Sequence, residues 1–183
     1  MKKMKKTIFS VIFLLCVIAT AHAQLQEHDN LLGATLGLWA HNHVPTLGVN
    51  YEYQLTQAGI GTISLGGILK YYSWTDNYSD GDSRKYTFTT LGIQSNYNFN
   101  QIGDGKFVPF IGLVISYNSV NETYTDVHGH GVYYTDIAYT SGAWIWAQTG
   151  MRYFFSNNVA GAVRLNLGNN DFYTIELGVD FKF

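Results

Sequence analysis

The feature that most restricts the fold of this chain is an alternation of apolar and other residues, with a period of two, that recurs from residue 31 to the C-terminus. In the last segment, Leu177, Val179 and Phe181 share one face of an extended strand, while Glu176 and Asp180 share the other. Beyond residue 23, no apolar run reaches the about 20 residues that a membrane-spanning helix needs. The sequence therefore predicts a chain of strands, most with one apolar face.

Eight segments alternate in this way, and each is long enough for the about 9–11 residues with which a tilted strand crosses a bilayer. They comprise residues 31–41, 45–55, 62–74, 85–99, 107–117, 134–155, 159–167 and 172–183. An open strand edge in lipid would leave backbone groups unpaired at several kcal/mol each, so the sheet must close. We predict an all-β fold: an eight-stranded antiparallel up-and-down transmembrane β-barrel. A barrel of this size is too narrow for an open pore, so its interior should be filled by side chains.

The N-terminus has the pattern of a signal peptide. Four lysines precede an apolar run at residues 8–19, and Ala21 and Ala23 place small residues where a signal peptidase requires them. A helix of these 12 residues would span about 18 Å, against about 30 Å for the bilayer core. We therefore expect a signal peptide at residues 1–23 and one outer-membrane barrel domain at residues 24–183. The only cysteine, Cys16, lies in the leader, so the mature barrel should contain no disulfide.

The mature chain should be acidic. Removal of the leader takes away four of the 11 basic residues and none of the 13 acidic ones, which leaves a net charge of 7 − 13 = −6. A protein without a basic surplus is a poor partner for nucleic acid, and we expect none. We predict no cofactor.

Every second segment ends in outward aromatic residues. The pattern glycine, two residues, aromatic, one residue, aromatic occurs at 48–53, 150–155 and 178–183, and segment 85–99 keeps the aromatic ending. Such rings favour the boundary between hydrocarbon and headgroups, so they predict an aromatic girdle at one end of the barrel. The connections at that end are short, while two connections at the other end are long. The short ones are 56–61, 100–106 and 156–158, and the long ones are 75–84 and 118–133.

The faces that point into the barrel carry charges, which should pair because an unpaired buried charge is very costly. We expect an interior charge network of Glu52, Lys70, Arg152, Arg164 and Glu176. With a three-residue tip at 169–171, Arg164 falls opposite Glu176, which predicts an ion pair between them. Other inward polar residues by the same parity are Gln94, Asn96, Gln148, Asn166 and Asp180.

Two tryptophans, Trp144 and Trp146, also point inward by this parity. Glycines on the same inward faces either make room for these side chains or ease the curvature of the strands. These glycines are Gly37, Gly48, Gly66, Gly92, Gly112, Gly150 and Gly178.

The end of the chain resembles the C-terminal signal that the insertion machinery of bacterial outer-membrane proteins reads, carried here by Gly178, Phe181 and Phe183. The whole mature chain resembles the small eight-stranded outer-membrane β-barrels of Gram-negative bacteria: the OmpA transmembrane domain, OmpX and the opacity-type adhesins. This resemblance implies an integral outer-membrane protein with both termini in the periplasm and the long loops outside the cell. Because the chain ends at Phe183, we expect no peptidoglycan-binding module.

The same resemblance implies the partners. They are outer-membrane lipids and lipopolysaccharide and, during biogenesis, periplasmic chaperones and the barrel-insertion machinery; the barrel itself should be a monomer. The expected function is a structural or adhesion-like surface interaction through the long second and third outer loops, without enzyme activity. The third loop is rich in tyrosine (Tyr117, Tyr124, Tyr133 and Tyr134) and could extend as a hairpin that offers a strand edge to an extracellular ligand.

Three other functions stay open at this stage. A lipid A-modifying enzyme would need hydroxyl, imidazole and carboxylate within hydrogen-bond reach, for which His41, His43, Asp76 and Ser79 supply the residue types. The His-x-Ser pair of the barrel deacylases is absent from the sequence. The remaining alternatives are a small porin and a soluble, lipocalin-like periplasmic protein that binds an apolar ligand.

Two sequence patterns bear on metal binding. The pairs His41/His43 and His128/His130 could each place two rings on one strand face, which suits Zn or Cu. Residues 76–82 faintly resemble a Ca²⁺ loop but lack the closing glutamate. Ordinary turn chemistry accounts for both patterns, so we predict no metal site.

Overall fold

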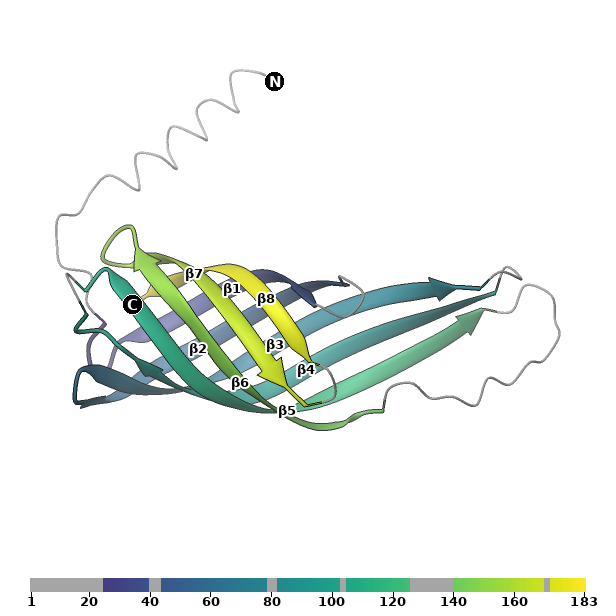
Figure 1. The fold of residues 1–183 in the computed structure, drawn as a ribbon, viewed down its shortest axis with the longest axis horizontal. Coiled ribbons are helices and arrows are strands. Elements are labelled where there is room, and N and C mark those ends of the chain that lie inside the picture. Colours follow the sequence, from purple (N-terminus) through teal and green to yellow (C-terminus); the bar gives the residue numbers. More distant parts are fainter. Residues whose placement is uncertain (1–24, 40–43, 79–81, 103–104, 126–139, 170–171) are drawn as a thin grey trace, which may run out of the picture.

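The computed structural model describes residues 25–39, 44–78, 82–102, 105–125, 140–169 and 172–183. These residues form one closed antiparallel barrel, in which each strand pairs with the next and β8 pairs with β1 (Figure 1). The strands are β1 (Asn30–Trp39), β2 (Val44–Ala58), β3 (Gly61–Asn77), β4 (Ser83–Asn98), β5 (Phe107–Thr125), β6 (Gly142–Phe154), β7 (Val159–Gly168) and β8 (Tyr173–Lys182). The predicted fold class is confirmed. The expected leader at 1–23 lies outside the described residues.

None of the described residues forms a helix long and apolar enough to span a bilayer.

The two faces of the strands point as the alternation predicts. On β8, Leu177 is 64% exposed and Phe181 is 50% exposed, whereas Glu176 is 1% exposed and Asp180 is fully buried. The other strands show the same alternation of buried and exposed positions. The barrel therefore has an apolar outer wall and a polar interior, which is the reverse of a soluble protein.

Strand ends differ from the prediction on one side of the barrel. β3 continues to Asn77 rather than ending at 74, β4 begins at Ser83 rather than 85, and β5 continues to Thr125 rather than ending at 117. The outward face of these added residues is polar, and on β5 the other face mixes Val120 and Tyr124 with Glu122, so the period-two signal weakens although the strands continue. β6 begins at Gly142 rather than at 134; residues 140–141 are not in a strand, and 134–139 lie outside the described residues.

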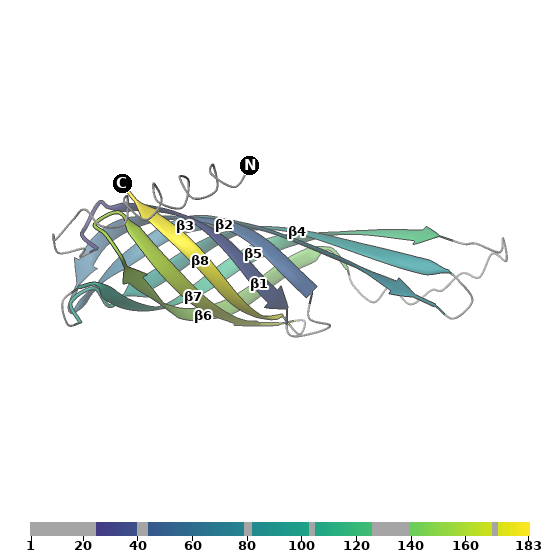
Figure 2. The same cartoon turned by 90° about the horizontal axis from the view of Figure 1, so that it is seen from above.

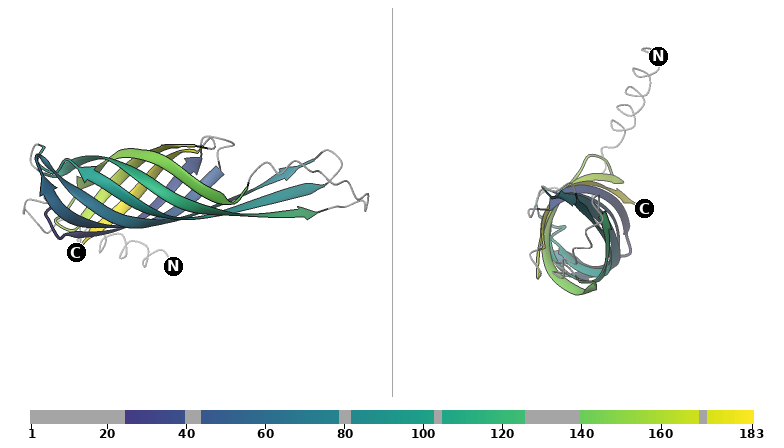
Figure 3. Two further views of the ribbon diagram at one scale, coloured as in Figure 1. Left: turned by 90° about the horizontal axis from the view of Figure 1, so that it is seen from below. Right: turned by 90° about the vertical axis from the view of Figure 1, so that its right-hand side faces the viewer.

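The longer strands form a small sheet that protrudes beyond the barrel rim. β3 pairs with β2 only as far as Tyr72, and β5 pairs with β6 only as far as Asn118. Past these points β3, β4 and β5 still pair with one another, up to Asn77 opposite Ser83 and Thr125 opposite Ser83. We call residues 73–77, 83–89 and 119–125 the extension; Figures 1 and 2 and the left view of Figure 3 show it leaving the closed part of the barrel.

The opposite end of the barrel carries the short connections. At that end the start of β1 meets the end of the chain, and the sheet closes between β1 and β8. Asn30, at the start of β1, exchanges two backbone hydrogen bonds of 3.0 Å with Phe183. The side chain of Lys182 contacts Asp29 at 3.3 Å beside this junction. The start of β1 and the C-terminus therefore meet at the end away from the extension (Figure 3).

Candidate functional site

The interior of the barrel is built around a layer of ionised side chains. They are Glu52 on β2, Lys70 on β3, Arg152 on β6, Arg164 on β7, and Glu176 and Asp180 on β8, and all are buried. Cations and anions are equal in number in this layer, so it is formally neutral. This balance matters because an excess charge would be held in a low-dielectric interior without a counter-ion.

Arg152 is the centre of this charge network. Its Nε donates to Asp180 at 2.7 Å, one Nη donates to Glu52, and the other donates to the side-chain oxygen of Asn98 at 2.5 Å. The guanidinium also lies over the ring of Phe110, 4.3 Å from its centroid. One side chain thus ties together strands β2, β4, β5, β6 and β8 across the lumen.

Arg164 lies opposite Glu176 in the β7–β8 register, as the three-residue tip predicts. The predicted ion pair between these two residues is nevertheless wrong. One Nη of Arg164 contacts both carboxylate oxygens of Asp180, at 2.7 and 2.6 Å. The reason lies across the barrel: Lys70 on β3 pairs with Glu176 instead.

The Lys70–Glu176 ion pair is further supported by neutral groups. Asn166 donates to the same carboxylate oxygen at 3.1 Å, and the hydroxyl of Thr174 donates to it at 2.9 Å. The ammonium of Lys70 lies 5.6 Å from the centroid of the Phe172 ring. Charge-assisted hydrogen bonds of this kind are stronger than neutral ones, and they fix which strand faces which inside the lumen.

An aromatic cluster fills the interior between the charge network and the extension. Tyr72 stacks on Phe88 with ring centroids 4.8 Å apart, and Trp146 packs against Phe172 at 4.7 Å. Trp144 meets the same Phe172 edge-on at 5.7 Å. Both tryptophans therefore lie inside the barrel, as their parity predicts.

A smaller apolar cluster fills the other end of the lumen. It consists of Leu25, Leu31, Val108, Phe154 and Ala160, all essentially without exposed surface. Leu25 precedes the first strand and turns into the barrel. Its carbonyl accepts a hydrogen bond from the side chain of Asn100.

A void of about 10 Å³ lies beside the charge network, next to Asn50 and Arg164. The amide atoms of Asn50 and one Nη of Arg164 make no hydrogen bond within the described part of the chain. A space of about 10–15 Å³ with such partners accommodates one water molecule. With both ends packed by apolar side chains, the described interior is filled rather than open.

The inward glycines make room for side chains other than Trp144 and Trp146. A Cβ at Gly150 would lie 2.7 Å from the ring of Phe110, and one at Gly37 would lie 2.6 Å from Cγ of Glu176. It is Gly168 that lies beside Trp146, since a Cβ at Gly168 would lie 2.6 Å from Cβ of Trp146. The glycines therefore leave space for the residues that surround the charge network.

The outer wall is apolar and is bordered by aromatic rings at the end with the short connections. Tyr97 and Phe99 form one edge-to-face pair there, with centroids 4.8 Å apart, and Tyr153 and Phe155 form another at 5.5 Å. These pairs correspond to the predicted girdle. A band of exposed leucine, isoleucine and valine follows toward the extension, on every strand. Such a band suits hydrocarbon rather than water.

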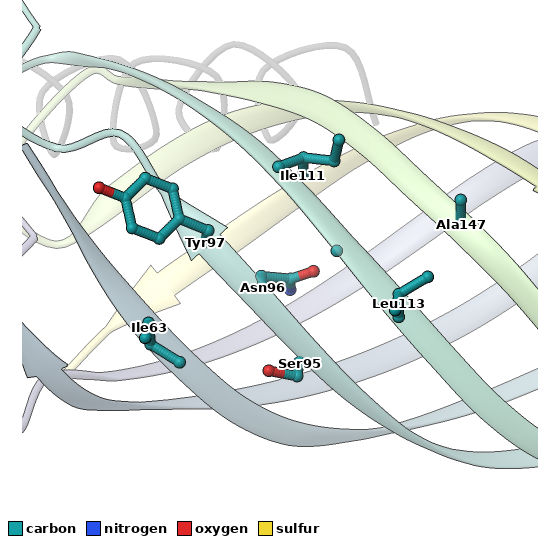
Figure 4. A pocket seen from close by; sticks show the side chains of 8 residues that line it. Ile63, Ser95, Asn96, Tyr97, Ile111, Leu113 and Ala147 are labelled. Atoms are coloured by element: carbon teal, nitrogen blue, oxygen red, sulfur yellow. The ribbon is translucent and has the colours of Figure 1, made fainter. Parts of the chain in front are cut away.

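Figure 4 shows a shallow depression in this wall, where Ser95 and Ala147 are small and larger side chains such as Ile63, Ile111 and Leu113 surround them. The hydroxyl of Ser95 donates to the backbone oxygen of Ser64 at 3.0 Å. Its polar group is thereby satisfied within the sheet, and the depression offers an apolar surface without a charged group.

Solved structures share this architecture. A structure described under the de novo design of transmembrane β-barrels has a TM-score of 0.57 at 11% identity, over 87% of this chain and 99% of that chain. Ail, the attachment invasion locus protein of Yersinia pestis, in complex with a heparin analogue, has a TM-score of 0.53 at 10% identity, over 86% of this chain and 100% of Ail. The N-terminal β-barrel domain of Pseudomonas aeruginosa OprF has a TM-score of 0.50 at 15% identity, over 86% and 98%. This chain has the fold of the small eight-stranded outer-membrane β-barrels.

At 10–15% identity, each of these similarities is one of fold. No protein-family model matches the sequence, and no curated protein matches it. The outer-membrane barrel fold is incompatible with the soluble, lipocalin-like alternative, because that function requires the apolar faces inside and the charges outside.

The residues of the expected insertion signal lie at the closing seam of this outer-membrane barrel. Phe181 and Phe183 are exposed on the outer wall, where they extend the aromatic border, and Gly178 lies opposite Ala162 and Thr35.

The residues considered for catalysis or metal binding are not brought together by the described part of the structure. His41, His43, Ser79, His128 and His130 lie outside the described residues. Asp76 is exposed near the tip of β3. Within the described ranges, no three His, Cys, Asp or Glu side chains form a group that could hold a metal ion.

Proposed function

We propose that the protein is an integral outer-membrane barrel that presents its extension on the cell surface and acts there by binding, not by catalysis. The observation that carries this proposal is the combination of a filled lumen with strands that continue past the barrel rim. A filled lumen has no room for transport. This leaves the extension, which a minimal barrel lacks, as the part that can act on the cell surface. The apolar wall supports insertion in a bilayer.

In this proposal the expected leader at 1–23 directs export and is removed. The aromatic border near Tyr97 and Phe155 lies at the periplasmic side of the membrane, and the extension lies outside the cell. Long connections of outer-membrane barrels are extracellular and short ones periplasmic, which supports this orientation. The barrel is a monomer surrounded by lipids and lipopolysaccharide, after chaperones and the insertion machinery have delivered it.

The extension offers backbone as well as side chains for binding. Because the pairing of β3 with β2 stops at Tyr72, residues 73–77 of β3 pair with β4 on one side and have no strand on the other side among the described residues. An extended polypeptide could pair with such an edge, as in other cases of strand addition. Of the tyrosines expected to act in the third loop, Tyr117 is exposed on the outer wall, while Tyr133 and Tyr134 lie outside the described residues.

Single-cysteine labelling in intact cells tests the orientation. The mature chain should contain no cysteine, so Asn121→Cys on the extension and Gln101→Cys at a short connection each give one thiol. A membrane-impermeant maleimide should label the Asn121→Cys variant in intact cells. It should label the Gln101→Cys variant only after the outer membrane has been permeabilised. The opposite pattern, or recovery of the protein in the soluble periplasmic fraction, would refute the proposal.

Mass spectrometry of lipid A tests the non-catalytic part of the proposal. In this proposal the protein does not act on lipid A, so lipid A from cells that lack the protein and from cells that overproduce it should carry the same acyl chains. A species shifted by one acyl chain in the overproducing cells alone would instead establish a lipid A-modifying enzyme.

A further inference from the structure

The outward face of β3, β4 and β5 changes its chemistry at one level of the sheet. Leu69, Leu91 and Tyr117 lie side by side in the last apolar row, since Leu69 pairs with Leu91 and Leu91 with Tyr117. Two residues further along each strand, the corresponding row is Tyr71, Thr89 and Ser119. The apolar wall therefore gives way to hydroxyl groups at the same height on three strands.

Beyond that level the outward face is polar, and most of its residues carry a hydroxyl. We call it the hydroxyl face; it consists of Ser73, Thr75 and Asn77 on β3, Ser83, Lys85, Thr87 and Thr89 on β4, and Ser119, Asn121 and Thr123 on β5. Thr75, Lys85, Thr89, Asn121 and Thr123 are exposed. Ser73 is committed within the sheet, since its hydroxyl donates to the backbone oxygen of Tyr86 at 2.7 Å.

No carboxylate belongs to the hydroxyl face. The acidic side chains of the same strands alternate to the other side of the extension: Asp76 pairs in register with Arg84, and Glu122 forms an ion pair of 2.9 Å with Arg84. The chain as a whole has more acidic than basic residues, 13 against 11. A face with a lysine and without acids in such a chain is suited to a partner that is itself anionic.

The position of the hydroxyl face identifies which partner is near it. It continues the lipid-facing wall on the same strands, whose pairing runs through this level without a shift in register, and the row of Thr75 and Lys85 lies six residues along the strands from the last apolar row. At about 3.3 Å per residue, this is about 20 Å along the strand. A lipid whose acyl chains contact the apolar wall therefore places its headgroup against the hydroxyl face.

We propose that the hydroxyl face binds the saccharide headgroups of the anionic glycolipid in the outer leaflet of the same membrane. Threonine, serine and asparagine supply donors and acceptors to sugar hydroxyls, and Lys85 supplies a cation to phosphate or carboxylate groups on the sugars. The inference rests on the proposed orientation of the barrel. It adds that this side of the extension is anchored in the sugar layer, which leaves the strand edges and the other side for further partners.

The test compares the thermal stability of the folded barrel in two membranes. The full mature chain is folded into phosphatidylcholine vesicles with and without lipopolysaccharide, and unfolding is followed by the mobility shift of the heat-denatured barrel on gels. Vesicles with phosphatidylglycerol at the same surface charge serve as the anionic reference. Lipopolysaccharide should raise the unfolding midpoint of the wild-type chain by about 2–4 °C, a shift that a modest binding free energy gives in a chain of this size. Phosphatidylglycerol should not.

Three variants locate the effect. T75E/T89E/T123E places carboxylates on the hydroxyl face and should lose most of the stabilisation by lipopolysaccharide. T56E/Q57E/Q101E adds the same charge at exposed positions at the opposite end and should keep it. T75V/T89V/T123V removes the hydroxyls without a change of shape or strand propensity, and it should lose a large part of the stabilisation while folding normally.

The outcomes separate this inference from the proposed function. Equal stabilisation of wild type and of T75V/T89V/T123V would overturn the inference, as would equal stabilisation by phosphatidylglycerol. If the Asn121→Cys variant is labelled from outside under those circumstances, the barrel is oriented as proposed and only the saccharide contact is wrong. If Asn121→Cys is not labelled in intact cells, the proposed function itself fails.

Discussion

Replacement of Arg152 by leucine should destabilise the barrel by about 3–5 kcal/mol, the cost of breaking a buried ion pair by removing one partner. The guanidinium has no exposed surface and contacts Glu52, Asp180 and Asn98 at once. Its loss leaves the interior with one net negative charge, and the carboxylates of Glu52 and Asp180 each lose an ion-pair partner. Reversible unfolding in guanidinium chloride, from phospholipid vesicles, measures the change in the free energy of unfolding.

A second substitution separates charge from packing. Glu52→Gln in the Arg152→Leu background restores a neutral interior, so part of the lost stability should return and the two changes should not add. Lys85→Leu, on the exposed face of the extension, also removes a cation and should change the free energy by less than about 1 kcal/mol. If R152L and K85L lowered the free energy of unfolding by equally small amounts, Arg152 would not be a major source of stability in the interior.

The facing and register of the strands could be predicted because both follow from local geometry. Successive side chains of a strand point to opposite sides, so the alternation around Leu177 assigned Glu176 and Asp180 to the interior. The tip between β7 and β8 is short, which fixed Arg164 opposite Glu176 by counting. Neither step needs knowledge of the rest of the barrel.

The ion-pair partners could not be predicted by the same means. Lys70 and Glu176 are 106 residues apart in sequence and belong to strands that do not pair, so they meet only because the barrel is closed and narrow. Arg164 can reach either Glu176 or Asp180, and the choice depends on which carboxylate is already held by a residue from the far wall. Sequence parity identifies the members of such a network but not its pairing.

The extent of the extension could not be predicted for a different reason. A strand that crosses a membrane must alternate, because one side meets lipid and the other the lumen; above the membrane no lipid requires an apolar face. Residues 119–125 carry serine, asparagine and threonine on one side and a mixture of Val120, Glu122 and Tyr124 on the other, so their period does not distinguish them from a loop. Their serine, threonine and asparagine content does identify the level at which the apolar wall ends.

An arginine in place of Leu113 should cost about 2–4 kcal/mol of folding free energy in a bilayer, the value for a cation at the midplane of a membrane barrel. Leu113 is 61% exposed on the outer wall of β5, midway between Phe107 at one border and Tyr117 at the other. A cation there has neither water nor a carboxylate beside it. Unfolding of the L113R variant from vesicles, under the conditions used for R152L, measures the cost.

The matched control is Asn121→Arg. Asn121 lies on the same strand as Leu113 and also points outward, but it belongs to the hydroxyl face of the extension. The substitution should change the free energy by less than about 1 kcal/mol, as expected for a cation outside the hydrocarbon. The contrast between two arginines eight residues apart on one strand depends on where the bilayer ends, not on strand propensity or net charge. Equal costs at both positions would mean that the boundary is not between Tyr117 and Asn121, and the surface position of the extension would no longer follow. A large cost at Leu113 alone would place the extension in water or in the sugar layer.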